Sequence, residues 1–117
     1  TVERLVLRDD GGAYFGSVLA DTSRPHGFGV EISADGARYE GEWRAGARHG
    51  PGRETAPGGA VYSGGFDDGL RHGEGLAGPR PQGLPVYTEV WHYGCLMARE
   101  VAMQAAPLTR AARPPEA

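Results

Sequence analysis

Three histidines first suggest chemistry in this sequence, because His26, His49 and His72 recur at intervals of 23 residues and each precedes a glycine. Imidazole is a common zinc ligand, and zinc holds its nitrogen ligands at about 2.0–2.1 Å. Equivalent positions two strands apart in a sheet are separated by roughly 10 Å, so the three side chains cannot share one ion. We therefore expect no metal site, and we expect each imidazole to hydrogen-bond backbone near a turn.

A glycine-rich segment, residues 73–78, formally matches the G-x-G-x-x-G fingerprint of dinucleotide-binding folds. In that mechanism a helix must follow the glycines, because its N-terminus faces the pyrophosphate. Here Pro79-Arg80-Pro81 follows instead. We therefore expect no bound nucleotide and no other cofactor.

Carboxylate pairs and the lone cysteine are the remaining candidates for catalysis. Glu40 with Glu42, and Asp67 with Asp68, fall on expected solvent faces or turns, where carboxylates keep ordinary solvation. Cys95 lies in or just after the last expected turn, and no neighbouring residue marks it as a nucleophile. A sheet of one layer also offers no deep pocket that excludes water. We expect no catalytic residues and no enzyme activity.

The same spacing that places the histidines runs through the whole chain. Tyrosines recur at positions 14, 39, 62 and 87, and the segment Tyr39-Glu40-Gly41-Glu42-Trp43 has a counterpart in Tyr62-Ser63-Gly64-Gly65-Phe66. A period in this range indicates a stacked array, in which no unit buries its apolar face alone.

The pattern Tyr-x-Gly-x-aromatic followed by His-Gly-x-Gly resembles the MORN (membrane occupation and recognition nexus) repeat. The resemblance covers about residues 5–96 and is most specific in residues 39–61 and 62–86. The residues that define the repeat are Gly16, His26, Gly27, Gly29, Gly41, Gly46, His49, Gly50, Gly52, Gly64, Gly69, His72, Gly73 and Gly75. The resemblance implies an array of β-hairpins over residues 1–96.

We predict an all-β fold, a single-layer twisted antiparallel sheet of stacked hairpins with a short C-terminal cap helix. The expected units are residues 5–13 (partial), 14–38, 39–61, 62–86 and 87–96 (partial), giving about eight strands and a length of roughly 35–40 Å. Pro51 falls inside an expected strand, where it cannot donate a ladder hydrogen bond, so we place it at a bulge or a non-pairing position.

The array is expected to end after residue 96. Glu89 takes the position that glycine holds in the other units, which is typical of a capping repeat. Residues 97–106 favour a cap helix by composition and by the stripe Met97, Val101 and Ala105, although a last strand is the alternative. Residues 107–117 are expected to be disordered.

Aromatic side chains recur on one side of the expected strands, because side chains alternate with period two. These are Tyr14, Tyr39, Trp43, Tyr62, Phe66, Tyr87 and Trp91. Two interpretations remain open. The rings either stack only on one another and on the glycines, or they also leave an apolar groove that binds a helix or an extended segment of another protein.

Composition narrows the range of partners. The 117 residues carry a net charge of −3, and all 12 basic residues are arginine, so nothing favours DNA or RNA. Membrane contact is expected to be weak, because only Arg99, Arg110 and Arg113 lie near the expected cap helix. One cysteine and the lack of an apolar run of about 20 residues favour a cytoplasmic protein.

The resemblance implies a non-catalytic scaffold or adaptor that binds other proteins in a larger assembly. Proteins of this family occur in ciliary axonemes and cytoskeletal collars, so a cilium or the cytoskeleton is the expected setting. A peripheral membrane module, or the repeat module of a larger enzyme, is the alternative. The exposed edge strands at the ends of the array also permit a homodimer.

Overall fold

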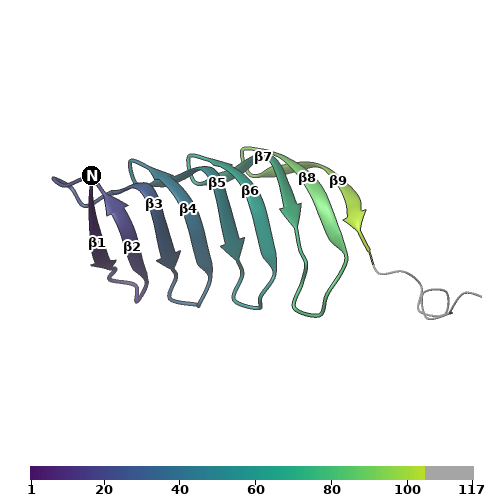
Figure 1. Ribbon diagram of the computed structural model, residues 1–117, viewed down its shortest axis with the longest axis horizontal. Helices are drawn as coiled ribbons and strands as arrows, with labels where there is room; N and C mark the ends of the chain where they lie inside the picture. Colours follow the sequence, from purple (N-terminus) through teal and green to yellow (C-terminus); the bar gives the residue numbers. More distant parts are fainter. Residues whose placement is uncertain (105–117) are drawn as a thin grey trace, which may run out of the picture.

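The computed structural model describes residues 1–104 as one antiparallel sheet of nine strands (Figure 1). The strands pair strictly in sequence order, so each strand from β2 to β8 lies between its two chain neighbours. Their bounds are β1 (Val2–Leu7), β2 (Ala13–Val18), β3 (Pro25–Ile32), β4 (Arg38–Arg44), β5 (Ala47–Thr55), β6 (Val61–Asp67), β7 (Leu70–Ala77), β8 (Val86–His92) and β9 (Cys95–Met103). The predicted all-β, single-layer antiparallel sheet is confirmed.

Two-residue turns close three of the hairpins. Residues 45–46 join β4 to β5, residues 68–69 join β6 to β7, and residues 93–94 join β8 to β9. Both residues of each turn have positive φ, as in Asp68 (51°) and Gly69 (84°). This is the type I′ geometry, whose twist matches that of the flanking strands.

The hairpins contain regular bulges. Between Gly41 and Trp43, β4 advances by two residues while β5 runs from Gly52 back to Arg48. The same irregularity follows Gly16 in β2 and Gly64 in β6. Pro51 lies among the extra residues of β5, so its expected place at a bulge is confirmed.

The core lies on one face of the sheet, where rings and glycines alternate. Tyr39, Gly41 and Trp43 are all buried, whereas Glu42 between them is exposed. The ring of Tyr39 lies directly over Gly52 of the next strand: a Cβ there would stand 2.5 Å from Tyr39 Cε2. Tyr14 lies over Gly29 and Tyr62 over Gly75 in the same way. A side chain at any of these glycines would displace the ring.

The prediction of a cap helix is wrong for residues 97–103, which belong to strand β9. This strand pairs with β8 at seven positions, from His92↔Cys95 to Val86↔Met103. The helical propensity of the segment is therefore overridden by the open edge of β8, which supplies a backbone hydrogen-bond partner along the whole segment. Residues 105–117 are not described, so the end of the predicted helix and the predicted disordered tail lie outside the described residues.

Candidate interaction surfaces

The aromatic residues predicted as a binding face form a continuous zigzag of edge-to-face contacts. Ring centroids are 5.3 Å apart for Tyr14–Trp43, 5.1 Å for Tyr39–Trp43 and for Tyr39–Phe66, 5.5 Å for Tyr62–Phe66 and 6.2 Å for Tyr62–Trp91. The interplanar angles are between 81° and 87°, which is the favoured T-shaped arrangement. We call this side of the sheet the aromatic face.

The polar ends of these rings are satisfied inside the sheet. The Tyr39 hydroxyl donates to the Glu42 carbonyl at 2.8 Å, and Trp43 Nε1 donates to the Gly29 carbonyl at 3.2 Å. Tyr14 makes the matching bond to Ser17 at 2.6 Å. Burial raises the pKa of Tyr14 and of Tyr39 to about 12, although a nearby arginine opposes the shift in each case.

Most of the predicted binding residues are therefore core residues. Tyr14, Tyr39, Trp43, Tyr62 and Phe66 are at most 6% exposed, and Tyr87 and Trp91 at the C-terminal end are half-buried. This burial leaves the five central rings almost no surface to offer to a partner.

Arginines cover the aromatic face. The guanidinium of Arg48 lies 4.6 Å from the ring centroid of Tyr39, that of Arg71 lies 4.3 Å from Tyr62, and that of Arg99 lies 4.9 Å from Tyr87. A guanidinium over a ring face is attracted by the ring quadrupole. These contacts exclude water from the outer side of the rings.

Glutamates link the arginines into a chain of ion pairs. Glu54 accepts from Arg48 at 2.7 Å and from Arg71 at 2.6 Å, and Glu31 lies 3.3 Å from both Arg8 and Arg48. Burial of Glu54 disfavours its ionised form, but the hydrogen bonds from Arg71 and Arg48 outweigh burial and lower its pKa. This chain of ion pairs was not predicted from sequence, although Glu31 and Glu54, like Arg48 and Arg71, are 23 residues apart.

Glu89 forms a separate ion pair further along the same face and is 1% exposed. Its carboxylate accepts hydrogen bonds from Arg99 at 2.6 and 2.8 Å and from Trp91 Nε1 at 3.0 Å. The carboxylate at the glycine position is thus held by strand β9, which packs beside β8 where a capping helix was predicted.

Two repeat histidines, His26 and His72, bind the hairpin turns of the neighbouring unit, as expected from sequence, whereas within residues 1–104 His49 makes no such backbone hydrogen bond. Their Nδ1 atoms accept hydrogen bonds from the backbone N–H groups of Ala45 (3.1 Å) and Tyr93 (3.0 Å). In a neutral imidazole the proton then resides on Nε2, so neither nitrogen has a free lone pair for a metal. Among residues 1–104 no group of three or more His, Cys, Asp and Glu side chains is placed to hold a metal ion.

The other repeat-defining residues also serve the backbone. On the aromatic face, Gly16, Gly41 and Gly64 pair with Gly29, Gly52 and Gly75, over which the tyrosine rings lie. At the bulges, Gly27, Gly50 and Gly73 follow the histidines, and Gly46 and Gly69 lie in the turns. The Nδ1 atom of His49 lies 3.6 Å from an Asp67 carboxylate oxygen. The N–H groups of Gly46 and Gly69 donate to the carbonyls of Pro25 and Arg48 in the preceding unit. Each hairpin tip is thereby tied to the repeat before it.

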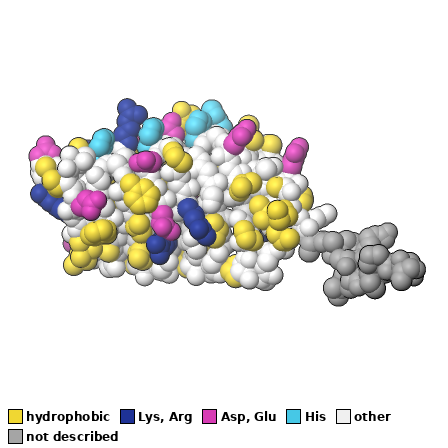
Figure 2. Space-filling view, viewed as in Figure 1, with side chains coloured by type: hydrophobic (Ala, Val, Ile, Leu, Met, Phe, Trp, Pro, Cys, Tyr) yellow, Lys and Arg dark blue, Asp and Glu magenta, His cyan; other side chains and the backbone are white. Residues whose placement is uncertain are grey.

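The opposite side of the sheet, which we call the second face, carries exposed apolar side chains at both ends (Figure 2). Over β1–β3 these are Leu5, Leu7, Phe15, Phe28 and Ile32, which are 47–76% exposed. We call this group the N-terminal patch. Its neighbours on β4 are the charged residues Arg38, Glu40 and Glu42.

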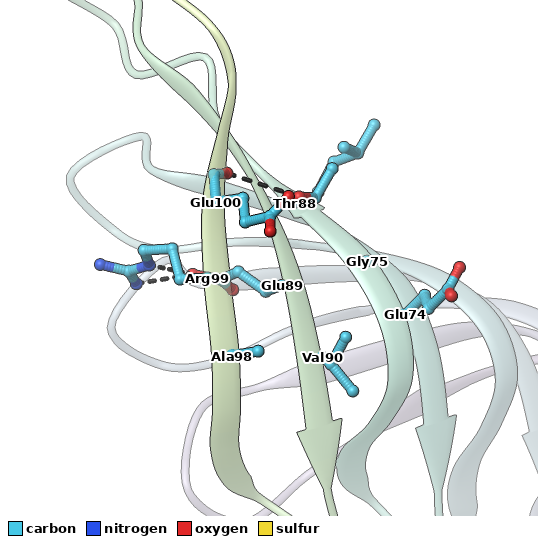
Figure 3. Close-up of a pocket in the computed structure, with 9 residues that line it drawn as sticks. Glu74, Gly75, Thr88, Glu89, Val90, Ala98, Arg99 and Glu100 are labelled. Atoms are coloured by element: carbon cyan, nitrogen blue, oxygen red, sulfur yellow. Dashed lines mark hydrogen bonds and ion pairs between the residues drawn. The ribbon is translucent and has the colours of Figure 1, made fainter.

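The other end of the second face is concave (Figure 3). A hollow of about 530 Å³ lies over β7–β9, and its second-face side chains are Leu76, Val90 and Ala98 with Glu74, Thr88 and Glu100. We call it the C-terminal hollow. This hollow was not predicted from sequence, because β9, the third strand of its lining, lies in a segment that was predicted to be a helix.

The second face is acidic. Its charged side chains on the strands are Glu3, Glu40, Glu42, Asp67, Glu74 and Glu100 against Arg38, Arg44 and Arg53, so six negative and three positive charges leave a net charge of −3. Arg38 and Glu40 form an ion pair at 3.2 Å. Within residues 1–104 no helix is long and apolar enough to cross a membrane.

Comparison with known families gives one match. Residues 23–38, 39–61 and 62–76 match the family model described as the MORN repeat. These consecutive segments run from before β3 into β7, through the most regular part of the aromatic zigzag. A comparison with curated proteins gives no match.

Proposed function

Because this chain is a MORN-repeat protein, with repeats matched over residues 23–76, we propose that it is a non-catalytic scaffold that binds other proteins within a larger assembly. MORN repeats suggest a module that binds proteins or membranes. The observation that carries the proposal is the one-sided core: the rings pack on the aromatic face, and no second layer covers the apolar side chains of the second face within residues 1–104. Uncovered apolar surface of this kind marks interaction sites.

The use of the ionisable groups supports a binding role. Glu54 and Glu89, the most strongly bonded carboxylates, are held by arginines that cover rings. His26 and His72 accept hydrogen bonds from the backbone of hairpin turns. These groups stabilise the array, and a rigid extended array is how stacked repeats present a surface to a partner.

We place the assembly in a cilium or the cytoskeleton, in the cytoplasm. This part of the proposal is supported only by the kinds of protein that the repeat resembles. The measurement is immunofluorescence of the chain in ciliated cells with axonemal and membrane fractionation. Recovery in the membrane fraction would overturn it.

The experiment that tests scaffold function is affinity purification of the tagged chain, followed by reconstitution of a stable complex from the purified chain and one recovered protein. We expect co-elution of the two proteins in size-exclusion chromatography. Failure of every recovered protein to form a complex would overturn the proposal. Pairing of two copies through the edge strands β1 and β9 is a second route to assembly, and sedimentation velocity would detect it.

Membrane association is the second candidate, and the N-terminal patch favours it. Five large apolar side chains on three adjacent strands give an uncovered area that is unusual on a soluble surface. The acidic charge of the second face opposes anionic lipid. Flotation with neutral and anionic vesicles distinguishes the candidates, because only a membrane module floats with either.

A further inference from the structure

We propose that the C-terminal hollow binds a basic, apolar segment of a partner protein, with an apolar side chain in the hollow and flanking Arg or Lys residues on its acidic rim. This inference rests on the proposed protein-binding function and adds to it the site and the chemistry of the partner. It places binding on the second face and leaves the aromatic face as a core.

The floor of the hollow is apolar and uncovered. Leu76 is 44% exposed and Val90 is 42% exposed, and the register places both on the second face with Ala98. A volume of about 530 Å³ is within the range of sites that hold a small ligand or a few peptide residues. Concave apolar surface gives a partner side chain more buried contact than a flat surface does.

The rim of the hollow carries uncompensated negative charge. Neither the Glu74 nor the Glu100 carboxylate takes part in any ion pair or side-chain hydrogen bond among residues 1–104, whereas Glu89 and Arg99 are paired with each other on the aromatic face (Figure 3). Opposite charges across an interface steer association and set its specificity. The complementary partner is therefore cationic, which disfavours an anionic lipid surface at this site.

The N-terminal patch differs in its charge environment. Its neighbouring carboxylate Glu40 is already paired with Arg38, whereas the C-terminal hollow joins a concave apolar floor to two carboxylates, Glu74 and Glu100, that lie outside the ion pairs among residues 1–104.

The test uses the full chain and two short labelled peptides that differ only in charge: one alternates Arg with Leu and Val, and the other alternates Glu with the same apolar residues. Fluorescence anisotropy is expected to show that the basic peptide binds with a dissociation constant on the order of 100 µM and that the acidic peptide does not. Amide shifts in a ¹H–¹⁵N spectrum should map to β7–β9.

Variants identify the site. The double variant Glu74→Gln, Glu100→Gln should lower the affinity for the basic peptide by roughly threefold to thirtyfold, because two exposed ion pairs are lost. The variant Val90→Arg should abolish binding of this peptide. The matched control Glu42→Gln removes a carboxylate from the same face outside the hollow and should leave the affinity unchanged. Circular dichroism confirms that each variant is folded.

Equal binding of both peptides, or unchanged binding by the hollow variants, would overturn the inference. So would peptide shifts at the N-terminal patch, or a dimer that Val90→Arg dissociates, since a second copy would then occupy the hollow. If the purified partner of the scaffold experiment still binds the hollow variants, this inference fails while the proposed function stands. If no partner complex forms at all, the proposed function fails.

Discussion

Each buried tyrosine in this chain meets three requirements at once. Tyr39 packs its ring edge against Trp43 and Phe66, lies over Gly52, and donates its hydroxyl to a backbone carbonyl. The guanidinium of Arg48 lies over the ring on its outer side and helps to bury it. The tyrosine thus packs in the apolar core and also hydrogen-bonds the backbone of its own strand. Phenylalanine would keep the packing and lose the hydrogen bond.

Ionisation of the buried tyrosines should limit stability at high pH. Burial raises the pKa of Tyr14 and Tyr39 from 10.0 to about 12, so the folded protein holds these protons more tightly than the unfolded chain does. This stabilisation is fully present below pH 10 and is lost as the pH rises toward 12. Urea unfolding at several pH values should show the loss, and absorbance at 295 nm should show late tyrosinate formation. Ionisation of all tyrosines near pH 10 in the folded protein would contradict the prediction.

Glu89 should depend strongly on Arg99. Arg99→Ala leaves a buried carboxylate with Trp91 as its remaining donor, so we expect a loss of about 1–3 kcal/mol in the free energy of unfolding. In a Glu89→Gly background, which restores the repeat glycine, Arg99→Ala should cost clearly less, because only the contact of Arg99 with the Tyr87 ring is then lost. Denaturant unfolding of the four proteins measures the coupling. Equal losses in both backgrounds would show that the carboxylate does not need the arginine.

The residue-scale features were only partly predictable from the sequence. Period-two alternation correctly places Tyr39 and Trp43 on one face and Glu42 on the other. The ion pairs of Glu54 were not predicted, because Arg48 and Arg71 precede the histidines at the bulge, and there the local register departs from simple alternation. A bulge shifts the face on which the next side chain lies, and the alternation of residue types does not show how many residues the bulge contains.

At the scale of the element, the hairpin is a two-strand unit whose ring and glycine belong to different strands. The ring of β4 needs bare backbone in β5, and the ring of β6 needs it in β7. Glycine is therefore a packing requirement at these positions, in strands where its flexibility would otherwise be unfavourable.

Adding a methyl group at Gly52 should lower the free energy of unfolding, whereas adding one at Gly58 should leave it nearly unchanged. A Cβ at Gly52 would stand 2.5–2.6 Å from Tyr39 Cε2 and Cζ, whereas a Cβ at Gly58 meets no atom within 4 Å. Gly52→Ala should therefore cost about 1–3 kcal/mol of unfolding free energy, as overpacked cores do, and Gly58→Ala should change it by less than about 0.5 kcal/mol. Thermal and urea unfolding compare them. A stable Gly52→Ala protein would mean that the ring moves aside freely.

The one element that sequence reasoning assigned wrongly is β9. Met97, Val101 and Ala105 form a helical stripe, and the local composition favours helix. Strand pairing depends on what lies beside a segment, and the open edge of β8 is visible only once the sheet exists. Hairpin turns such as Asp68-Gly69 were predictable, because their conformational demand is local.

At the scale of the whole molecule, stability passes between neighbouring repeats. Backbone pairing joins the described strands in chain order, ring contacts such as Tyr14–Trp43 reach the next strand but one, and β1 and β9 each have a single pairing partner. Strands β2 to β8 are supported from both sides, and the buried rings all lie on strands of this group. The array should therefore open from its ends.

Native-state hydrogen exchange should show this gradient. We expect the amides of β4–β6 to exchange most slowly and those of β1 and β9 to exchange faster by at least about tenfold, because end strands open without breaking the central ring contacts. Mass spectrometry of peptides after timed labelling gives the rates. Uniform protection across all nine strands would indicate a single cooperative unit instead.

The packing of each repeat on the next also fixes the distance between sites at opposite ends of the array. Each 23-residue unit adds two strands, or roughly 10 Å, between the N-terminal patch and the C-terminal hollow, and it keeps the phase of the rings. Duplicating or deleting one such unit would change the distance between these two surfaces in steps of that size and rotate one relative to the other by the accumulated strand twist. The spacing of two sites on the array thus depends on the number of repeats between them and is independent of the residues that form either site.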